Sequence, residues 1–149
     1  MPPTFKTDHL AFVTGDTALT VDFYTRVMGW PLVDAFQGVK GDGTRSFISA
    51  FQADGFVLEF EEIKGRAAPA QQVLAFPHLG LDVGNHGEYE RWKAHLAECG
   101  TPFVETREHN CWITDPNGVS FQLIVKEADD SSPEARATRA HELFEEWVS

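Results

Sequence analysis

Residues 8–30, DHLAFVTGDTALTVDFYTRVMGW, contain a strand followed directly by a helix. Residues 8–15 alternate apolar and polar side chains, as a half-buried strand does. Asp16 or Thr17 is expected to cap the helix, and Gly29 stands where a helix ends in the left-handed backbone conformation. Between them, apolar residues recur at helical spacing: Leu19, Phe23 and Val27. The order of elements that begins with this strand–helix unit occurs again in the second half of the chain.

Three strand-like stretches follow at residues 30–36, 44–52 and 55–61, and glycine-containing turns separate them. The next residues contain Lys64-Gly65-Arg66 and Pro69, which indicate a linker. We therefore predict a first βαβββ module at about residues 6–62 and a linker at about residues 63–75.

The same order begins again after the linker. Residues 77–84 are typical of a strand, and residues 88–100, EYERWKAHLAECG, are typical of a helix that ends at glycine. Further strands are expected at residues 101–106, 109–114 and 119–126. The last two are joined by Asp115-Pro116-Asn117-Gly118, where both Asn and Gly tolerate the positive φ of a tight turn. A second module is predicted at about residues 76–126.

The two predicted modules keep the same spacing of key residues. His78 lies 69 positions after His9, and Gly100 lies 71 positions after Gly29. A histidine near the start of both first strands, and a helix-ending glycine at the matching place in both, favour a duplication.

Polar residues interrupt the fourth strand of each predicted module. Glu59 lies between Leu58 and Phe60, and Gln122 occupies the matching position between two apolar residues. These side chains either point outward to solvent or turn toward a shared cavity with His9 and His78. Two imidazoles, a carboxylate and an amide oxygen suit a divalent metal ion such as Ni²⁺, Co²⁺, Zn²⁺, Fe²⁺ or Mn²⁺.

Two motifs resemble those of the vicinal oxygen chelate superfamily, which comprises glyoxalases, bleomycin resistance proteins and extradiol dioxygenases. Residues 8–30 resemble its opening motif, a first-strand histidine followed by a helix ending in Phe-Tyr-x-x-x-x-Gly. Residues 113–123, ITDPNGVSFQL, resemble its closing Asp-Pro-x-Gly turn and final strand. The resemblance implies an α+β fold of two βαβββ modules forming a cup-shaped sheet around a metal site, and a homodimer. It also implies four metal ligands: His9, Glu59, His78 and Gln122.

The final strand of most metal-binding members carries a glutamate where this chain has Gln122. Glu59 is then the only carboxylate among the four positions, and we expect it to act as both ligand and general base. This predicts a divalent-metal-dependent glyoxalase-like lyase or isomerase that acts on a small substrate chelated through vicinal oxygens. An extradiol-type ring-cleaving dioxygenase is one alternative, although its carboxylate comes from the final strand.

A non-catalytic antibiotic-binding protein, as in the bleomycin resistance branch, is the other alternative. It would hold a cationic drug in an acidic, aromatic groove. Candidates for its lining are Phe47, Phe51, Phe60, Trp112 and Phe121, positions that are also typical of a strand core.

Composition excludes several classes of partner. The net charge of −11 argues against nucleic acid, and the chain contains no apolar run of membrane-spanning length and no signal-peptide stretch. A cytoplasmic location is therefore expected. Cys99 and Cys111 give no disulfide framework and are interpreted as reduced side chains. Four basic residues are candidates for binding an anionic glutathione conjugate and are interpreted instead as surface charges: Arg26, Lys40, Arg45 and Arg107.

The tail is predicted to form an amphipathic helix at about residues 133–148. Its apolar residues at helical spacing are Ala137, Ala140, Leu143, Phe144 and Trp147. Such a helix most often packs on its own domain, and packing on a partner subunit is the alternative.

Overall fold

The computed structural model describes residues 8–66, 78–126 and 130–149. The first module contains β1 (His9–Thr14), α1 (Thr17–Asp22), the π-helical turn η1 (Phe23–Val27), β2 (Leu32–Val39), β3 (Arg45–Gln52) and β4 (Val57–Ile63). The second contains β5 (His78–Asp82), α2 (His86–Glu98), β6 (Val104–Arg107), β7 (Asn110–Thr114) and β8 (Ser120–Ile124). Helix α3 (Pro133–Val148) follows them.

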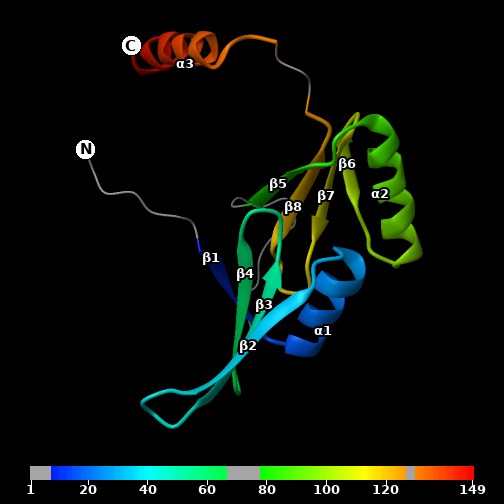
Figure 1. Cartoon of the computed structure of the whole chain (residues 1–149), viewed down its shortest axis with the longest axis vertical. Coiled ribbons are helices and arrows are strands. Elements are labelled where there is room, and N and C mark those ends of the chain that lie inside the picture. The colour runs from blue at the N-terminus through cyan, green and yellow to red at the C-terminus, as the bar shows by residue number, and fades with distance from the viewer. Residues whose placement is uncertain (1–7, 67–77, 127–129) are drawn as a thin grey trace.

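The strands form two four-stranded sheets with the same topology, β1-β4-β3-β2 and β5-β8-β7-β6 (Figure 1). In each sheet the first and fourth strands of the module are parallel neighbours, and the other pairs are antiparallel. The predicted α+β fold of two βαβββ modules is confirmed.

The first helix begins as the sequence predicts and then changes its winding. The Asp16 side chain accepts a hydrogen bond from the Leu19 amide at 3.0 Å, which satisfies one of the free donors of the first turn. Residues Phe23–Val27 of the predicted helix form η1, where the Met28 amide bonds the Phe23 carbonyl. Gly29 then ends the helix with φ of +70°, a conformation that costs glycine little.

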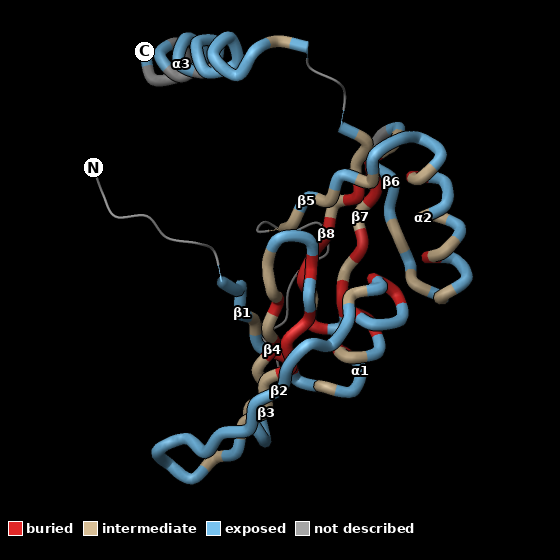
Figure 2. The backbone as a smooth tube through the Cα atoms, in the orientation of Figure 1, coloured by how far each residue is buried: buried red, intermediate tan, exposed pale blue. Residues whose placement is uncertain are grey.

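The two modules share one hydrophobic core on the helix side of the sheets. The fully buried Tyr24 of η1 places its ring 5.0 Å from Phe51 and 4.8 Å from Phe60 in the first sheet. Its ring also lies 6.1 Å from Phe121 in the second sheet. Figure 2 shows the buried residues where the strands meet α1 and α2, whereas β2 is exposed along its length.

A buried polar turn joins the modules. The Asn-Gly step does join the antiparallel strands β7 and β8, and of its two residues Gly118 alone adopts a positive φ. Asn117 is buried instead, and its amide bonds the hydroxyls of Thr14 and Thr20 in the first module. An asparagine with two tertiary partners is held in place by them, and glycine alone supplies the positive φ of the turn.

Helix α3 begins after Ser132, whose hydroxyl caps it, and stands apart from both sheets in Figure 1. Leu143, one of its predicted apolar residues, is exposed. The side chains of Ala140, Phe144 and Trp147 lie outside the described residues, as does Pro69 of the predicted linker. Within the described part of the chain, no helix is long and apolar enough to cross a membrane.

Candidate metal centre

Strand alternation decides which way the interrupting polar residues point. Leu58 and Phe60 on β4, like their counterparts on β8, are fully buried in the core beneath the helices. Because successive side chains of a strand alternate, Glu59 and Gln122 point to the opposite face of each sheet. We call this the open face. Both side chains are half-buried there, so they are not simply solvent-exposed.

Both modules place the histidine beside this polar residue in the same register. On the parallel neighbours β1 and β4, Ala11 is opposite Glu59, and His9 lies two residues earlier on the same face. In β5 and β8, Gly80 is opposite Gln122, and His78 again lies two residues earlier. The duplication inferred from sequence therefore extends to the geometry of the four candidate ligands.

His9 and Glu59 form the first half-site. The Nε2 atom of His9 is 3.5 Å from Oε2 of Glu59, and its Nδ1 atom is 2.7 Å from Oδ2 of Asp8. The hydrogen bond to Asp8, and secondly the charge of Glu59, raise the pKa of His9 above its usual value. Two ligand atoms bound to one tetrahedral ion at ordinary metal–ligand distances lie about 3.4 Å apart. The separation of His9 and Glu59 fits a shared metal ion.

Asp8 is a functional candidate that the sequence reasoning missed. Histidines that bind metals usually donate their other ring N–H to a carboxylate or carbonyl, which fixes the tautomer. With Nδ1–H directed at Asp8, the Nε2 lone pair of His9 faces Glu59. The signal available in the sequence was a carboxylate immediately before the candidate ligand.

His78 and Gln122 form the second half-site. The His78 ring lies 4.7 Å from the Trp112 ring, edge to face, and Trp112 is directly opposite Gln122 on β7. The Nε2 atom of Gln122 donates to Oδ1 of Asn110 at 3.3 Å. Its other amide atom, Oε1, is the one that can bind a cation. Asn110, which sequence reasoning also missed, thereby orients this amide.

The described part of one chain does not form a complete metal site. Among residues 8–66, 78–126 and 130–149, no group of three or more His, Cys, Asp or Glu side chains is arranged to hold a metal ion. His9 and Glu59 lie close to each other, but no third side chain of these types completes a site with them. The sequence left open whether the site forms within one chain or across two, and each half-site here is incomplete by itself.

The aromatic groove proposed for an antibiotic-binding protein is not formed. Phe51, Phe60 and Phe121 are fully buried on the helix side, because they alternate with the open-face residues. Phe47 lines a crevice with Arg45 and Glu62. By strand alternation and register, all three side chains lie on the helix side of the sheet. Of the five proposed residues, only Trp112 lies on the open face.

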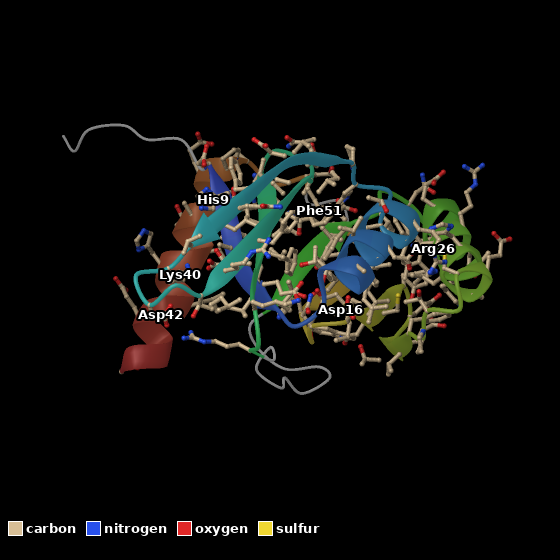
Figure 3. All side chains as sticks on the ribbon, turned by 90° about the horizontal axis from the view of Figure 1, so that it is seen from below. His9, Asp16, Arg26, Lys40, Asp42 and Phe51 are labelled. Atoms are coloured by element: carbon tan, nitrogen blue, oxygen red, sulfur yellow. The ribbon has the colours of Figure 1, made fainter. Side chains whose placement is uncertain are left out.

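Three of the four basic residues are engaged elsewhere or paired with a carboxylate, and Arg107 is opposite Asn110 on β7. Arg26 makes two hydrogen bonds to Asp22 and lies beside α2, far from His9 in Figure 3. Lys40 pairs with Glu61, and Arg45 lines the helix-side crevice. The side chain of Arg107 lies outside the described residues. The two cysteines are free, as expected from the sequence.

In comparison with known proteins, the chain matches one family model and many solved structures of similar fold. The model of the Glyoxalase/Bleomycin resistance protein/Dioxygenase superfamily matches residues 6–123. No curated protein matches the chain in sequence. Three solved structures illustrate the shared fold, and at these identities they show the fold alone.

The first is YycE of Bacillus subtilis, described as a putative glyoxalase/fosfomycin resistance protein, with 19% identity and a TM-score of 0.67 over 85% of this chain and 93% of that one. The second is the trypanothione-dependent glyoxalase I of Leishmania major, with 16% identity and a TM-score of 0.65 over 98% and 100%. The third is the fosfomycin resistance protein FosX of Listeria monocytogenes, with 14% identity and a TM-score of 0.63 over 93% and 99%. FosX has also been solved with manganese(II) and sulfate.

Proposed function

The chain belongs to the Glyoxalase/Bleomycin resistance protein/Dioxygenase superfamily, and on that basis we propose that it is a divalent-metal-dependent lyase or isomerase of the glyoxalase type. Its substrate would be a small molecule chelated through vicinal oxygens. The observation that carries the proposal is the His9–Glu59 pair, 3.5 Å apart and backed by Asp8 on the far nitrogen of the imidazole. A carboxylate on the second ring nitrogen is typical of a histidine that binds a metal, because it fixes the tautomer and the orientation of the ring.

We propose that two chains complete the metal site. The first half-site lies on β1 and β4 and the second on β5 and β8, and β1 and β5 each end their sheet. If the β1 edge of one copy lies beside the β5 edge of a second, His9 and Glu59 face His78 and Gln122 of the other copy. Twofold symmetry then produces two identical four-ligand sites.

Exposed apolar side chains support this association. Val13 on β1 and Phe36 on β2 belong to the open face of the first sheet and are 39% and 46% exposed. Large apolar side chains grouped on one face of a sheet usually mark a contact surface. The open face of a second copy would cover both.

The bound metal would act as a Lewis acid on the chelated oxygens of the substrate. Glu59 is the carboxylate that accepts the proton from the carbon next to the substrate carbonyl and returns it to the neighbouring carbon. His9 is held by Asp8 with Nε2 directed toward Glu59, and Asn110 holds Gln122 so that Oε1 is free. Of the four proposed metal ligands, Glu59 is thus the one that accepts a proton, and His9, His78 and Gln122 are neutral ligands.

The test combines metal binding with turnover. Purified protein is titrated with Ni²⁺ and assayed on methylglyoxal hemithioacetals, with Glu59→Gln and His9→Ala compared with the wild type. We expect both variants to lose turnover, and Glu59→Gln to retain weaker Ni²⁺ binding. Glu61→Gln is the matched control, since Glu61 lies on the same face but pairs with Lys40. Unchanged turnover in Glu59→Gln would refute its role as base.

The same preparation separates the alternatives. Oxygen consumption with catechol and Fe²⁺ would indicate an extradiol dioxygenase. Failure to bind any divalent metal would favour a non-catalytic binding protein. Sedimentation of the metal-loaded protein must show a dimer, because a monomer that binds Ni²⁺ tightly contradicts the two-chain site.

A further inference from the structure

The charges on the open face bear on the chemistry of the substrate. Asp34 is opposite Ala50, which is opposite Glu59, so Asp34 lies on the open face two strands from the metal ligand. Glu61 lies on the same face two residues along β4. In the second module, Asp82 lies two residues beyond Gly80 and is opposite Ile124, again on the open face.

Two of these carboxylates keep an uncompensated charge. Glu61 is neutralised by Lys40, whose ammonium lowers the pKa of that carboxyl. Glu59 is assigned to the metal. Within the described part of the chain, Asp34 and Asp82 accept hydrogen bonds from nearby backbone amides, of Ala35 and Gly84, and these bonds leave the negative charge in place.

Arg26 and Arg45 lie away from the open face. Arg26 is bound to Asp22 beside α2, and Arg45 lines the helix-side crevice with Lys64 and Glu62. Lys40 lies on the His9 side of the view in Figure 3, with Arg26 at the opposite end, and its ammonium is paired with Glu61. Among the open-face strand residues whose side chains the structure describes, carboxylates therefore outnumber cations; Arg107, opposite Asn110 on this face, is outside that set.

Trp112 adds an apolar surface to this face. It is half-buried, opposite Gln122 on the open face, and in edge-to-face contact with His78. The face of an indole ring attracts cations as well as apolar groups. The ring and the carboxylates therefore favour the same kind of ligand.

We infer that the substrate carries a neutral or positively charged apolar group next to its chelating oxygens, and not the carboxylates of a glutathione conjugate or a phosphonate. The inference rests on the proposed function, since it concerns the part of the substrate that extends beyond the metal. Asp34 lies two strands from Glu59, and Asp82 lies two residues beyond Gly80, the neighbour of Gln122. These spacings place the two carboxylates about 7–10 Å from the chelated atoms. At such distances two uncompensated carboxylates favour a cation over an anion by about 5-fold to 30-fold at low salt.

The test uses three catechols that share the chelating oxygens and differ in the group on the ring: none, a cationic aminoethyl group or an anionic carboxylate. Catechol, dopamine and 3,4-dihydroxybenzoate are titrated calorimetrically into the Ni²⁺-loaded protein at low salt. We expect dopamine to bind most tightly and 3,4-dihydroxybenzoate most weakly. Asp34→Asn should narrow the ratio of dopamine to dihydroxybenzoate affinity about 3-fold. The matched control is Asp22→Asn on α1, the same chemical change on the helix side, which should leave the ratio unaltered.

A second measurement does not depend on the metal. Quenching of Trp112 fluorescence by caesium, acrylamide and iodide is obtained as the difference between the wild type and Trp112→Phe. Caesium should quench Trp112 more efficiently than iodide relative to free tryptophan. Equal or stronger quenching by iodide, or tighter binding of 3,4-dihydroxybenzoate than of dopamine, would overturn the inference. If Ni²⁺ does not bind but caesium is preferred, the proposed reaction fails and the charge preference stands.

Discussion

Replacing Tyr24 by Phe tests how the two modules are held together. The Tyr24 hydroxyl donates to Oδ2 of Asp115 at 3.0 Å, and both residues are buried. The same carboxylate accepts from the backbone amides of Asn117 and Val119 and from the Asn117 side chain. Tyr24→Phe removes one of these four hydrogen bonds and keeps the ring that contacts both sheets.

The expected loss of stability follows from the charge of the acceptor. A hydrogen bond to a charged group contributes about 1.5–3 kcal/mol, and Asp115 is only 4% exposed, so solvent does not readily replace the missing donor. For a chain of this length each kcal/mol lowers Tm by about 2–4 °C, so Tm should fall by about 3–12 °C. The assay is thermal and urea denaturation of both proteins at several pH values.

The effect should also depend on pH with a defined sign. Burial raises the pKa of Asp115, and the Tyr24 hydroxyl is one of the donors that oppose this rise. When the pKa of an acid is higher in the folded protein than in the unfolded chain, the protein loses stability as the pH rises from the unfolded pKa through the folded pKa. Without the hydroxyl the folded pKa rises further, so Tyr24→Phe should be more destabilised at pH 8 than at pH 4.

Tyr89→Phe is the matched control. Its hydroxyl donates to Glu105, an exposed carboxylate within the second module, so water replaces the lost hydrogen bond. We expect a cost of about 0.5–1 kcal/mol with little pH dependence. The reasoning is refuted if Tyr24→Phe costs no more than Tyr89→Phe, or if its cost does not increase with pH.

Three further outcomes are expected. Asp8→Asn should lower the pKa of His9, measured by NMR titration, and weaken Ni²⁺ binding by about 10–100-fold; an unchanged affinity would mean that Asp8 does not position the ligand. Asn117→Ala breaks the hydrogen bonds to the first module and should reduce the free energy of unfolding by about 2–4 kcal/mol, measured in urea; a smaller loss would show that the modules do not depend on this turn. Removing residues 130–149 should leave Tm within about 2 °C, because α3 stands apart from both sheets; a large fall, or loss of the dimer in sedimentation, would show that α3 packs on a partner.

Local features of the site were accessible from the sequence. Strand alternation around Glu59 and Gln122, and the repeated spacing of His9 and His78, were enough to select four positions that the structure places in matching registers. Asp8 and Asn110 were missed. Asp8 directly precedes His9 in the sequence, but adjacency alone does not show that its carboxylate bonds the imidazole, and the bond from Gln122 to Asn110 depends on the alignment of β7 and β8. They matter only through the hydrogen bonds that the folded sheet allows.

The aromatic residues show where pattern alone fails. Phe51, Phe60 and Phe121 look equally suited to a ligand groove or a core in the sequence, since both need apolar side chains at alternate positions. Only the position of Tyr24, between the two sheets, decides that this face is the core. Once that face is fixed, the polar face with Trp112 is left for the ligand.

The strand–helix unit of residues 8–30, its repetition and the four candidate ligands were determined by the sequence alone, because alternation, helix caps and helix-ending glycines are local properties. Only the tertiary structure decided that His9 and Glu59 lie 3.5 Å apart and that, among the described residues, no third His, Cys, Asp or Glu completes a metal site with them. The relative position of two modules depends on the packing of Tyr24 and the buried turn at Asp115 and Asn117. Such contacts join residues about a hundred positions apart, and no local pattern records them.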